Sequence, residues 1–488
     1  MPPPPRRKRG WPSSCAGIWS IIKAETGADA EGPLPNGADL MTFEWPAHGL
    51  TLQARIESRT ATIGVIGMGY VGLPLAVAFG EAGCSVLGFD LDPEKVVALN
   101  QGESYIKHIP GDRIAPLVAE QRITATADLD RLGEVDVLLI CVPTPLTRHL
   151  EPDLKYVEHT TRAIARSLRK GQLVILESTT YPGTTREVMQ PILEEEGLVA
   201  GRDFFLAYSP EREDPGNPTF STTKIPKVVG ADDPASAGLA MALYRHIVPQ
   251  AIQVSSAATA EAVKITENVF RAVNIALVNE LKLIFTAMDI DVWEVIDAAK
   301  SKPFGFMPFY PGPGLGGHCI PIDPFYLTWK AREYNQHTRF IELAGQINAD
   351  MPQHVIRVLA DTLDARFGRG LRGARVLVLG VAYKKNVDDI RESPSLRLME
   401  MIEARGATAD FHDPHVAQIN GTREHPTLNF RHGIAWDEAT IAGYDAVLIA
   451  TDHDAVDYAA LAASAKLVID TRNACGKAGV TGANIARA

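Results

Sequence analysis

The chain has 488 residues, of which 46% are hydrophobic and 22% charged, and its formal net charge is −11 at pH 7. This length is too great for one ordinary hydrophobic core and predicts two or three domains. The negative balance argues against a general nucleic-acid binder or a protein of acidic membranes, because both need a net basic face. No apolar run reaches the length of a transmembrane helix.

The cysteines are scattered and form no C-x-x-C pair. An odd number of cysteines without metal-type spacing predicts reduced thiols in a cytoplasmic protein and gives no indication of a metal site. The five are Cys15, Cys84, Cys141, Cys319 and Cys475.

Residues 1–59 begin MPPPPRRKRG and continue with a weak pattern that Gly and Pro interrupt. The pair Arg6-Arg7 could suggest a twin-arginine export signal, but Pro12 and Ser13 spoil any hydrophobic region behind it. We therefore expect a disordered N-terminal extension, or a start codon placed too early.

From Thr62 the pattern changes to apolar strands that alternate with helices. TIGVIGMGYVG is a strand running into a glycine turn, LPLAVAFGEAG continues as a helix, and SVLGFDLD is a second strand. Further strands in VDVLLICVPTP, GQLVILESTTYPGTT and FFLAYSPERE each end in a polar tip. Residues 60–250 are therefore predicted to form a parallel, doubly wound sheet that binds ligands at the carboxyl ends of its strands.

Between Pro249 and Pro303 the sequence contains neither Gly nor Pro and is mostly predicted to be helical. Asp291 predicts the N-cap of a second helix. The region 251–368, which also contains a Gly/Pro-rich loop and a helix to about Phe367, is predicted to be a central dimerisation region. Its apolar residues recur every three or four positions, at Val269, Val273, Ala276, Leu277, Leu281, Ile284 and Met288.

Residues 369–488 are predicted to form a second α/β domain without a G-x-G-x-x-G sequence of its own. Its strands lie in GARVLVLGVAYK, ATADFHDP, YDAVLIATDH and AKLVIDTRN. The predicted fold class is therefore α/β, with two doubly wound Rossmann-like domains joined by a long central helix.

The glycine turn after the first strand is typical of a dinucleotide site. Gly67, Gly69 and Gly72 permit a tight turn with the pyrophosphate close to the backbone at a helix N-terminus. Asp90 ends the next strand, where it can bind the ribose hydroxyls and repel a 2′-phosphate, which favours NAD over NADP. Tyr70 and Val71 complete the predicted cofactor turn. The alternative is a merely structural glycine turn.

The loop PGPGLGGHCIPIDP, residues 311–324, contains a single cysteine among many glycines. The glycines expose the Cys319 thiol, and Asp323 is near enough in sequence to orient a water or polarise that thiol. The alternative is a buried structural cysteine. His318 is adjacent to Cys319 in sequence and is interpreted as a loop residue, because neighbours in a chain rarely face each other.

Cations and an amide complete the candidate site. Lys264 and Asn268 are one helical turn apart and form a donor pair able to hold an oxyanion, unless they belong to a solvated helix face. Lys384 follows a strand of the second domain, and Arg391 lies a few residues further on. Cations there suit a diphosphate or a carboxylate, unless they form a solvent-facing basic turn.

Taken in order, these motifs resemble the UDP-glucose/GDP-mannose dehydrogenase family over residues 62–472. The order is G-x-G-x-x-G, CVPTP, ESTTYPGTT, YSPER, AEAVKITEN, GGHCIPIDP and YKKNVDDIRES. The resemblance implies an NAD-dependent enzyme that oxidises the C6 alcohol of a nucleotide sugar twice. Cys319 would hold the aldehyde as a thiohemiacetal and then a thioester, and water would release the uronate.

The same resemblance implies roles for individual residues. Lys264 and Asn268 would stabilise the oxyanion, and Asp323 would act on water or the transferred proton. Further catalytic positions are Glu211 and Thr179, which would position water and substrate. The cofactor cleft would include Thr144, Glu177 and Arg391, and the substrate site Lys384, Arg212, Tyr310, Gly316 and Gly317.

Within the family, the H-C-I-P-I-D loop resembles that of enzymes acting on 2-acetamido sugars, because Ile322 stands where UDP-glucose dehydrogenases usually have Lys. This implies UDP-N-acetylglucosamine as substrate, with UDP-N-acetylgalactosamine, UDP-N-acetylmannosamine and UDP-glucose as alternatives, and a role in surface polysaccharides such as O-antigen. Two rivals are a single-oxidation hydroxy-acid dehydrogenase, which needs no thiol, and a non-catalytic nucleotide-sugar-binding protein, which would be expected to lose Cys319.

Overall fold

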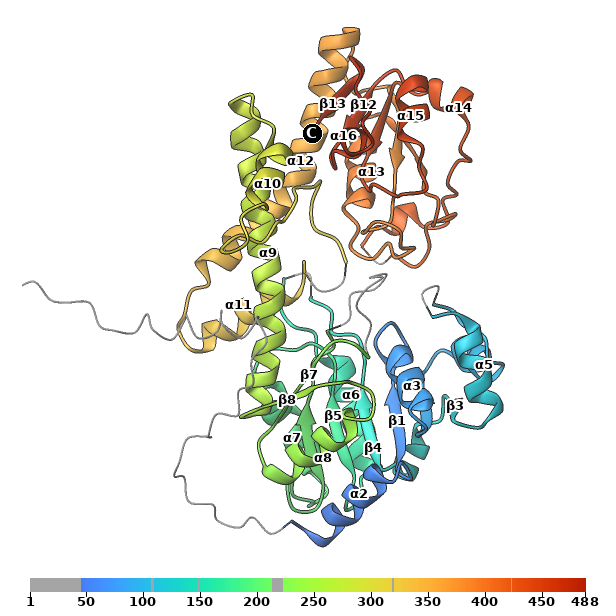
Figure 1. Ribbon diagram of the computed structural model, residues 1–488, viewed down its shortest axis with the longest axis vertical. Helices are drawn as coiled ribbons and strands as arrows, with labels where there is room; N and C mark the ends of the chain where they lie inside the picture. Colours follow the sequence, from blue (N-terminus) through green and yellow to red (C-terminus); the bar gives the residue numbers. More distant parts are fainter. Residues whose placement is uncertain (1–44, 107–108, 148, 213–222, 318–319, 423) are drawn as a thin grey trace, which may run out of the picture. The chain divides into compact units, whose positions relative to one another are not determined.

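The computed structural model describes residues 45–488 except 107–108, 148, 213–222, 318–319 and 423 (Figure 1). The first element is helix α2, Ala47–Glu57, which buries Leu52 and Ile56 against the first domain. The expected N-terminal extension therefore does not reach residue 59. Leu52 and Ile56 lie four positions apart on one helix face. This short apolar pattern was not recognised in the sequence because Pro and Gly residues lie close to it.

The first sheet has eight strands in the order β3-β2-β1-β4-β5-β6-β7-β8. All neighbouring strands are parallel except β6 and β7, which pair antiparallel. The sheet is thus not wholly parallel as predicted, because hydrophobic periodicity does not encode the direction of a strand. The strands are β1 Thr62–Ile66, β2 Ser85–Phe89, β3 Ile123–Thr126, β4 Val137–Ile140, β5 Leu173–Leu176, β6 Phe205–Tyr208, β7 Lys227–Ala231 and β8 Ala251–Val254.

Helices cover both faces of this sheet (Figure 1). Alternate residues of β4 enter different cores, since Val137 and Leu139 pack in one cluster and Leu138 and Ile140 in another. The continuous apolar runs in the sequence follow from this burial on both sides. The helices are α3 Gly72–Glu81, α4 Pro93–Asn100, α5 Gly111–Ala119, η3 Leu129–Glu134, α6 Lys155–Ser167, η4 Thr185–Met189, α7 Gln190–Leu193 and α8 Pro234–Tyr244.

The central region contains the predicted long helix, α9, which spans Ala257–Ala287. Asp291 caps the following helix by accepting a hydrogen bond from the Trp293 amide, as predicted. A buried amide contact joins α9 to α12, in which Asn279 donates to Asn348 at 2.9 Å. The other helices are α10 Val292–Ala299, α11 Asp323–Glu333 and α12 Arg339–Phe367.

The second sheet is parallel throughout, in the order β10-β9-β11-β12-β13. Its strands are β9 Arg375–Leu379, β10 Thr408–His412, β11 Ala446–Ile449, β12 Val468–Asp470 and β13 Ile485–Arg487. Its helical segments are α13 Pro394–Ala404, η5 Pro426–Leu428, α14 Glu438–Ala442, α15 Tyr458–Ser464 and α16 Ala474–Lys477.

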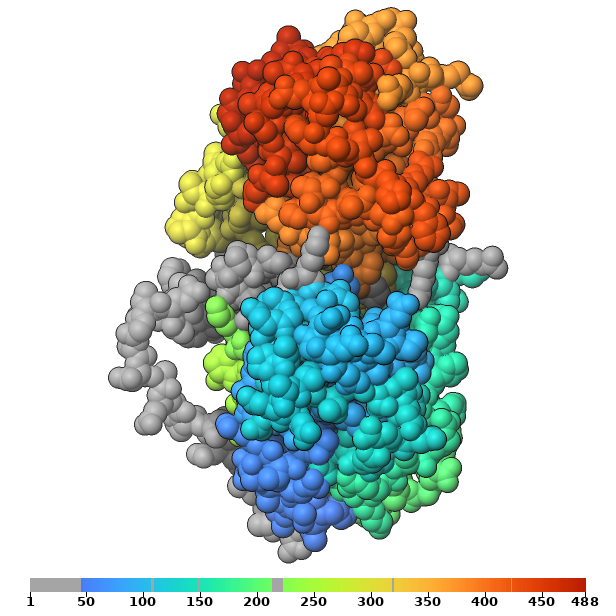
Figure 2. All heavy atoms as spheres, turned by 90° about the vertical axis from the view of Figure 1, so that its right-hand side faces the viewer, coloured from blue at the N-terminus to red at the C-terminus, as the bar shows by residue number. Residues whose placement is uncertain are grey.

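The predicted fold class, two Rossmann-like α/β domains with a long central helix, is confirmed. In the space-filling view, atoms from the two ends of the colour scale gather separately (Figure 2). Within the described part of the chain, none of the helices combines the length and apolar character that crossing a membrane requires.

Candidate active site

The glycine turn joins β1 to α3 and has the shape of a phosphate cradle. Gly67 has φ of +91°, and a Cβ there would lie 2.7 Å from the carbonyl oxygen of Cys141. A Cβ on Gly72 would overlap the carbonyl oxygen of Gly67, whereas one on Gly69 would meet no atom within 4 Å. Close contacts within the protein thus require glycine at positions 67 and 72, whereas the space beside Gly69 is open to a ligand.

Asp90 follows β2 and lies directly beside this turn. Its carboxylate accepts hydrogen bonds from the Met68 amide at 2.9 Å and the Asp92 amide at 3.0 Å. Lys95 approaches the same carboxylate at 3.3 Å. The acid is therefore anchored next to the glycine turn, where the ribose of a dinucleotide would lie.

The two glycines make different predictions for alanine variants. Gly72→Ala should lower the free energy of unfolding by at least about 2 kcal/mol, because the methyl group overlaps backbone. Gly69→Ala should fold like the parent protein and weaken NAD binding, because its methyl group occupies the space that we expect the pyrophosphate to fill. Denaturant unfolding and NAD titration measure the two effects. A Gly69→Ala variant with unchanged NAD affinity would contradict this placement of the cofactor.

Glu177, predicted to line the cofactor cleft, directly follows β5 and is fully buried. Its carboxylate accepts hydrogen bonds from Lys227 at 2.5 Å and from the Tyr244 hydroxyl. Although burial favours the neutral amine, Glu177 and Glu211 raise the pKa of Lys227, so this cation stays charged between the two carboxylates. Because its carboxylate is used within the protein, we expect Glu177 to shape the cleft and not to contact NAD through that group.

Three of the predicted catalytic side chains come together where α9 meets α11. Asp323 is the first residue of α11, and its carboxylate accepts a hydrogen bond from the Asn268 amide at 2.5 Å. Lys264, one turn before Asn268 on α9, is also buried and acts electrostatically on Asp323. The two α9 residues therefore face the interior, and the interpretation of a solvated helix face is wrong.

The environment of Asp323 prepares its carboxyl group for proton transfer. Burial raises the pKa of Asp323 to about 7, while Lys264 and the hydrogen bond from Asn268 act in the opposite direction. A carboxyl group that titrates near neutral pH can both take up and release a proton during turnover.

The α11 helix that carries Asp323 is fixed to the first sheet. The hydroxyl of Tyr326, on α11, donates to the carbonyl oxygen of Thr144, just beyond β4. Thr144, predicted to line the cofactor cleft, is itself buried. This bond links the predicted cleft to the helix that holds the candidate acid.

His318 and Cys319 lie outside the described residues, but the glycines before them are described. A Cβ on Gly316 or on Gly317 would come within 2.8 Å of the Tyr383 side chain. The amide of Gly317 donates to the carbonyl oxygen of Arg391 at 3.1 Å. The cysteine loop therefore packs directly on the loop after β9 and cannot carry side chains at these two positions without a shift.

Arg391 connects this loop to the glycine turn of the first domain. Its guanidinium lies 4.3 Å from the ring centroid of Tyr70 and also pairs with Asp389. Burial raises the pKa of Tyr70. The structure thus brings Arg391 to the predicted cofactor turn, and it places Lys384 half-buried in the same loop after β9.

The remaining predicted residues are less closely gathered. Glu211 and Thr179 are half-buried and follow β6 and β5. Arg212 pairs with Glu267 of α9 at 2.6 Å, and Tyr310 donates to Asp297 of α10 at 2.7 Å. The structure does not bring Tyr310 to the cluster around Asp323.

The sequence analysis missed a half-buried cation that contacts the cysteine loop. Arg472 follows β12, and its guanidinium lies against Gly312 in the cysteine loop. It donates to the carbonyl oxygen of Ala450 at 3.0 Å, and burial lowers its pKa. The only signal for it in the sequence was a basic residue directly after a buried strand.

Comparison with known proteins shows to which family the chain belongs. Three family models for the UDP-glucose/GDP-mannose dehydrogenase family match the chain in order: its NAD binding domain at residues 61–248, its central domain at 258–350 and its UDP binding domain at 377–477. The chain belongs to this family. It is an NAD-dependent dehydrogenase of nucleotide sugars, and the predicted cofactor, NAD, is confirmed.

Individual family members are similar over nearly their whole length. The UDP-N-acetyl-D-glucosamine 6-dehydrogenase of Pseudomonas aeruginosa is 37% identical over 80% of this chain and 90% of its own. The UDP-N-acetyl-D-mannosamine dehydrogenase of Pyrococcus horikoshii is 36% identical over 84% of this chain and 95% of its own. A solved UDP-D-ManNAc dehydrogenase from Pyrococcus horikoshii has a TM-score of 0.78 at 34% identity, covering 87% of this chain and 98% of that one.

Proposed function

We propose that this dehydrogenase oxidises the C6 hydroxyl of UDP-N-acetylglucosamine to a carboxylate through a covalent adduct on Cys319. The observation that carries this proposal is the buried cluster of Lys264, Asn268 and Asp323 at the end of the cysteine loop. The cluster supplies a cation, an amide donor and a carboxyl group that titrates near neutral pH. These are the groups that alcohol oxidation and thioester hydrolysis require.

The cofactor, when bound, accepts a hydride from C6 in each of the two oxidations. The Cys319 thiolate then attacks the aldehyde carbon, so that the first product stays attached and can be oxidised again. Lys264 and Asn268 stabilise the negative oxygen that forms on C6. Asp323 takes up the proton of the C6 hydroxyl and releases it to solvent. It later takes up the proton of the water that attacks the thioester, and Cys319 leaves as the thiolate.

Each part of the chain has a proposed task. Residues 60–250 bind NAD, residues 251–368 carry the cysteine loop and the subunit contact, and residues 369–488 bind the UDP-sugar. Gly316, Gly317, Lys384 and Arg212 are proposed to line the substrate site, with Glu211 and Thr179 positioning water and substrate. We also propose a cytoplasmic location and a role in surface polysaccharide synthesis. The free thiols of Cys84, Cys141 and Cys475 support the location.

The sugar is the least constrained part of the proposal. The two curated relatives are named for 2-acetamido sugars that differ in the configuration at C2. UDP-N-acetylmannosamine is therefore the leading alternative, ahead of UDP-N-acetylgalactosamine and UDP-glucose. A non-catalytic nucleotide-sugar-binding protein is disfavoured, because the cluster around Asp323 is complete.

Counting NADH tests this function. Purified protein is incubated with NAD and a limiting amount of each UDP-sugar, and the NADH formed per sugar is measured by absorbance. Two NADH per UDP-N-acetylglucosamine, with little signal from UDP-glucose, is the expected result. One NADH per sugar would contradict the double oxidation, and no signal from any sugar would favour the non-catalytic protein.

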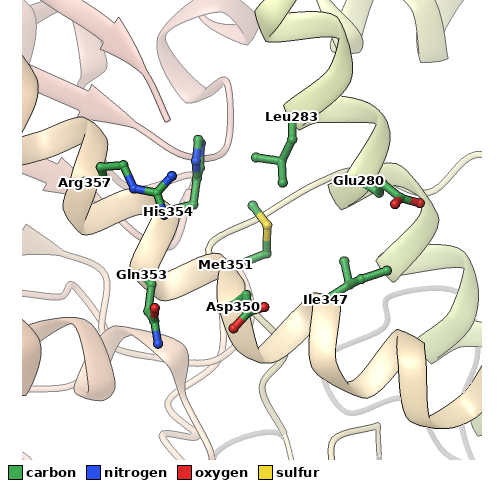
Figure 3. Close-up of a pocket in the computed structure, with 8 residues that line it drawn as sticks. All are labelled: Glu280, Leu283, Ile347, Asp350, Met351, Gln353, His354 and Arg357. Atoms are coloured by element: carbon green, nitrogen blue, oxygen red, sulfur yellow. The ribbon is translucent and has the colours of Figure 1, made fainter.

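We further propose that the chain forms a homodimer or a larger homo-oligomer through α9. Three of its apolar residues, Phe270, Leu277 and Ile284, are spaced seven apart and are 46–50% exposed. An open cavity of about 510 Å³ also lies between α9 and α12. Figure 3 shows Leu283 of α9 and Met351 of α12 pointing into it. Sedimentation equilibrium should give a multiple of 52.9 kDa, and a monomer at micromolar concentration would contradict the proposal.

A further inference from the structure

A buried histidine–aspartate pair lies at the carboxyl end of the second sheet, and no step of the proposed reaction uses it. His453 follows β11 and has no exposed surface. Its Nε2 lies 3.0 Å from the Asp413 carboxylate, and its ring lies beside that of His415, with 5.0 Å between the centroids. Burying such a pair is costly unless its hydrogen-bonding atoms find partners within the protein.

The pair fixes the loop that follows β9, residues 380–392, which we call the β9 loop. One oxygen of Asp413 accepts from the amides of Val381 at 2.7 Å and Ala382 at 3.0 Å. Nδ1 of His453 is 3.0 Å from the amide nitrogen of Asn386. Because a backbone amide can only donate, Nδ1 carries no proton, and Nε2–H donates to Asp413. The imidazole thus bridges the middle of the β9 loop, at Asn386, to the carboxylate that holds the start of the loop.

Other contacts hold the β9 loop without His453. Thr451 donates to the carbonyl oxygen of Ala382 at 2.6 Å, and the Asn386 amide group donates to Asp454 at 2.6 Å. Loss of the imidazole should therefore leave the loop in place and loosen its turn. Between the two points that the pair anchors lie Tyr383 and Lys384.

The β9 loop also bears on the cysteine loop. The Tyr383 side chain lies against Gly316 and Gly317, and the Arg391 carbonyl accepts from the Gly317 amide at 3.1 Å. The position of Tyr383 therefore sets the position of the backbone two residues before Cys319. Lys384, proposed to bind the UDP-sugar, is the next residue in the same turn.

We propose that His453 is a positioning residue for the nucleotide-sugar site. It holds the turn 383–386 so that Lys384 meets the UDP-sugar, while Tyr383 supports the glycines before the reactive cysteine. The proposal rests on the proposed function, because it assigns the substrate to Lys384. It predicts that the damage in a His453 variant falls mainly on the nucleotide sugar, because His453 holds the turn 383–386 and does not contact Arg391, the residue of the β9 loop that reaches the cofactor turn.

Three substitutions separate the two hydrogen bonds of the ring. His453→Ala removes both. His453→Asn can place an amide oxygen near the position of Nδ1 and so restore the acceptor for Asn386. His453→Gln can place a donor near Nε2, which keeps the bond to Asp413 and loses the one to Asn386. His432→Ala is the matched control, because His432 is an exposed histidine of the same domain.

The experiment measures the KM for UDP-N-acetylglucosamine and for NAD with the full chain, together with the affinity for UDP alone by calorimetry. His453→Ala should raise the KM for the sugar and the Kd for UDP about tenfold, the effect of losing one or two buried hydrogen bonds. The KM for NAD should stay within about twofold, and His453→Asn should recover more UDP affinity than His453→Gln. His432→Ala should change neither value.

Equal losses for UDP and NAD, or a lower melting temperature with unchanged UDP affinity, would show a merely structural histidine and overturn the inference. If the parent protein binds UDP but forms no NADH with any sugar, the proposed reaction fails, and UDP affinity alone then decides the role of His453. If the parent protein does not bind UDP, both proposals are overturned.

Discussion

Replacing Cys319 with Ser should lower uronate formation at least about a thousandfold and leave NAD binding unchanged. A serine hydroxyl is hardly ionised at neutral pH, so it cannot hold the aldehyde as a thiol adduct would. The first hydride transfer does not need the thiol, and the variant should therefore release some aldehyde with one NADH per sugar. Product analysis by mass spectrometry, together with an NAD titration, measures both parts of this expectation.

The matched control is another free cysteine. Cys475 is buried in α16, and burial raises the pKa of its thiol to about 12, so it is not ionised at neutral pH. Cys475→Ser should therefore turn over like the parent protein. Normal uronate formation by Cys319→Ser would rule out the covalent adduct and leave Asp323 and the α9 residues to act on a free aldehyde hydrate.

The sequence predicted the elements whose burial is uniform. β4 and β5 are apolar throughout because helices cover both faces, and each was recognised as a short apolar run between turn residues. β8 was missed because it is only partly buried and contains Gln253. β3, β7 and β13 were not predicted either. The antiparallel pairing of β7 was missed as well, since strand direction depends on partners distant in sequence.

Local sequence patterns predicted part of the candidate site but not its contacts between distant segments. Lys264 and Asn268 could be placed on one face because a helix relates residues four apart, and Asp323 because it follows the cysteine in the same loop. No local pattern joins Arg212 to Glu267, Tyr310 to Asp297, or His453 to Asp413. These are contacts between segments that only the folded chain brings together.

The free energy of unfolding of Asp323→Asn, measured relative to that of the parent protein, should rise with pH by up to about 4 kcal/mol. In the unfolded chain the carboxyl group ionises near its ordinary pKa of 3.8, whereas burial raises the pKa to about 7 in the folded chain. Between these pH values the folded state keeps a proton that the unfolded state has released, so the parent protein loses stability as pH rises. The two pKa values differ by about three units, and each unit corresponds to about 1.4 kcal/mol. The variant has no such group.

Denaturant unfolding of both proteins from about pH 4 to pH 8 gives the difference in unfolding free energy directly. The variant also leaves Lys264 without its carboxylate partner, and this cost is nearly constant over the pH range. It therefore shifts the difference in unfolding free energy by a constant amount and does not change how that difference varies with pH. Asp297→Asn is the control, because hydrogen bonds from Lys300 and Tyr310 lower the pKa of that exposed carboxylate below its ordinary value of 3.8. Asp297 is therefore ionised in both the folded and the unfolded chain over most of this range, and its difference should stay nearly flat from about pH 5 to pH 8.

A flat difference for Asp323→Asn would mean that Asp323 is ionised in the folded protein throughout this range and cannot donate a proton near neutral pH. The expected slope instead ties stability to turnover, because the burial that brings the carboxyl group to a pKa near 7 is the same burial that destabilises the folded state above that pH. The variant should then lose less stability than the parent protein as pH rises, and should form no uronate at alkaline pH. An active site that keeps an acid in this environment does so for proton transfer and at the expense of stability.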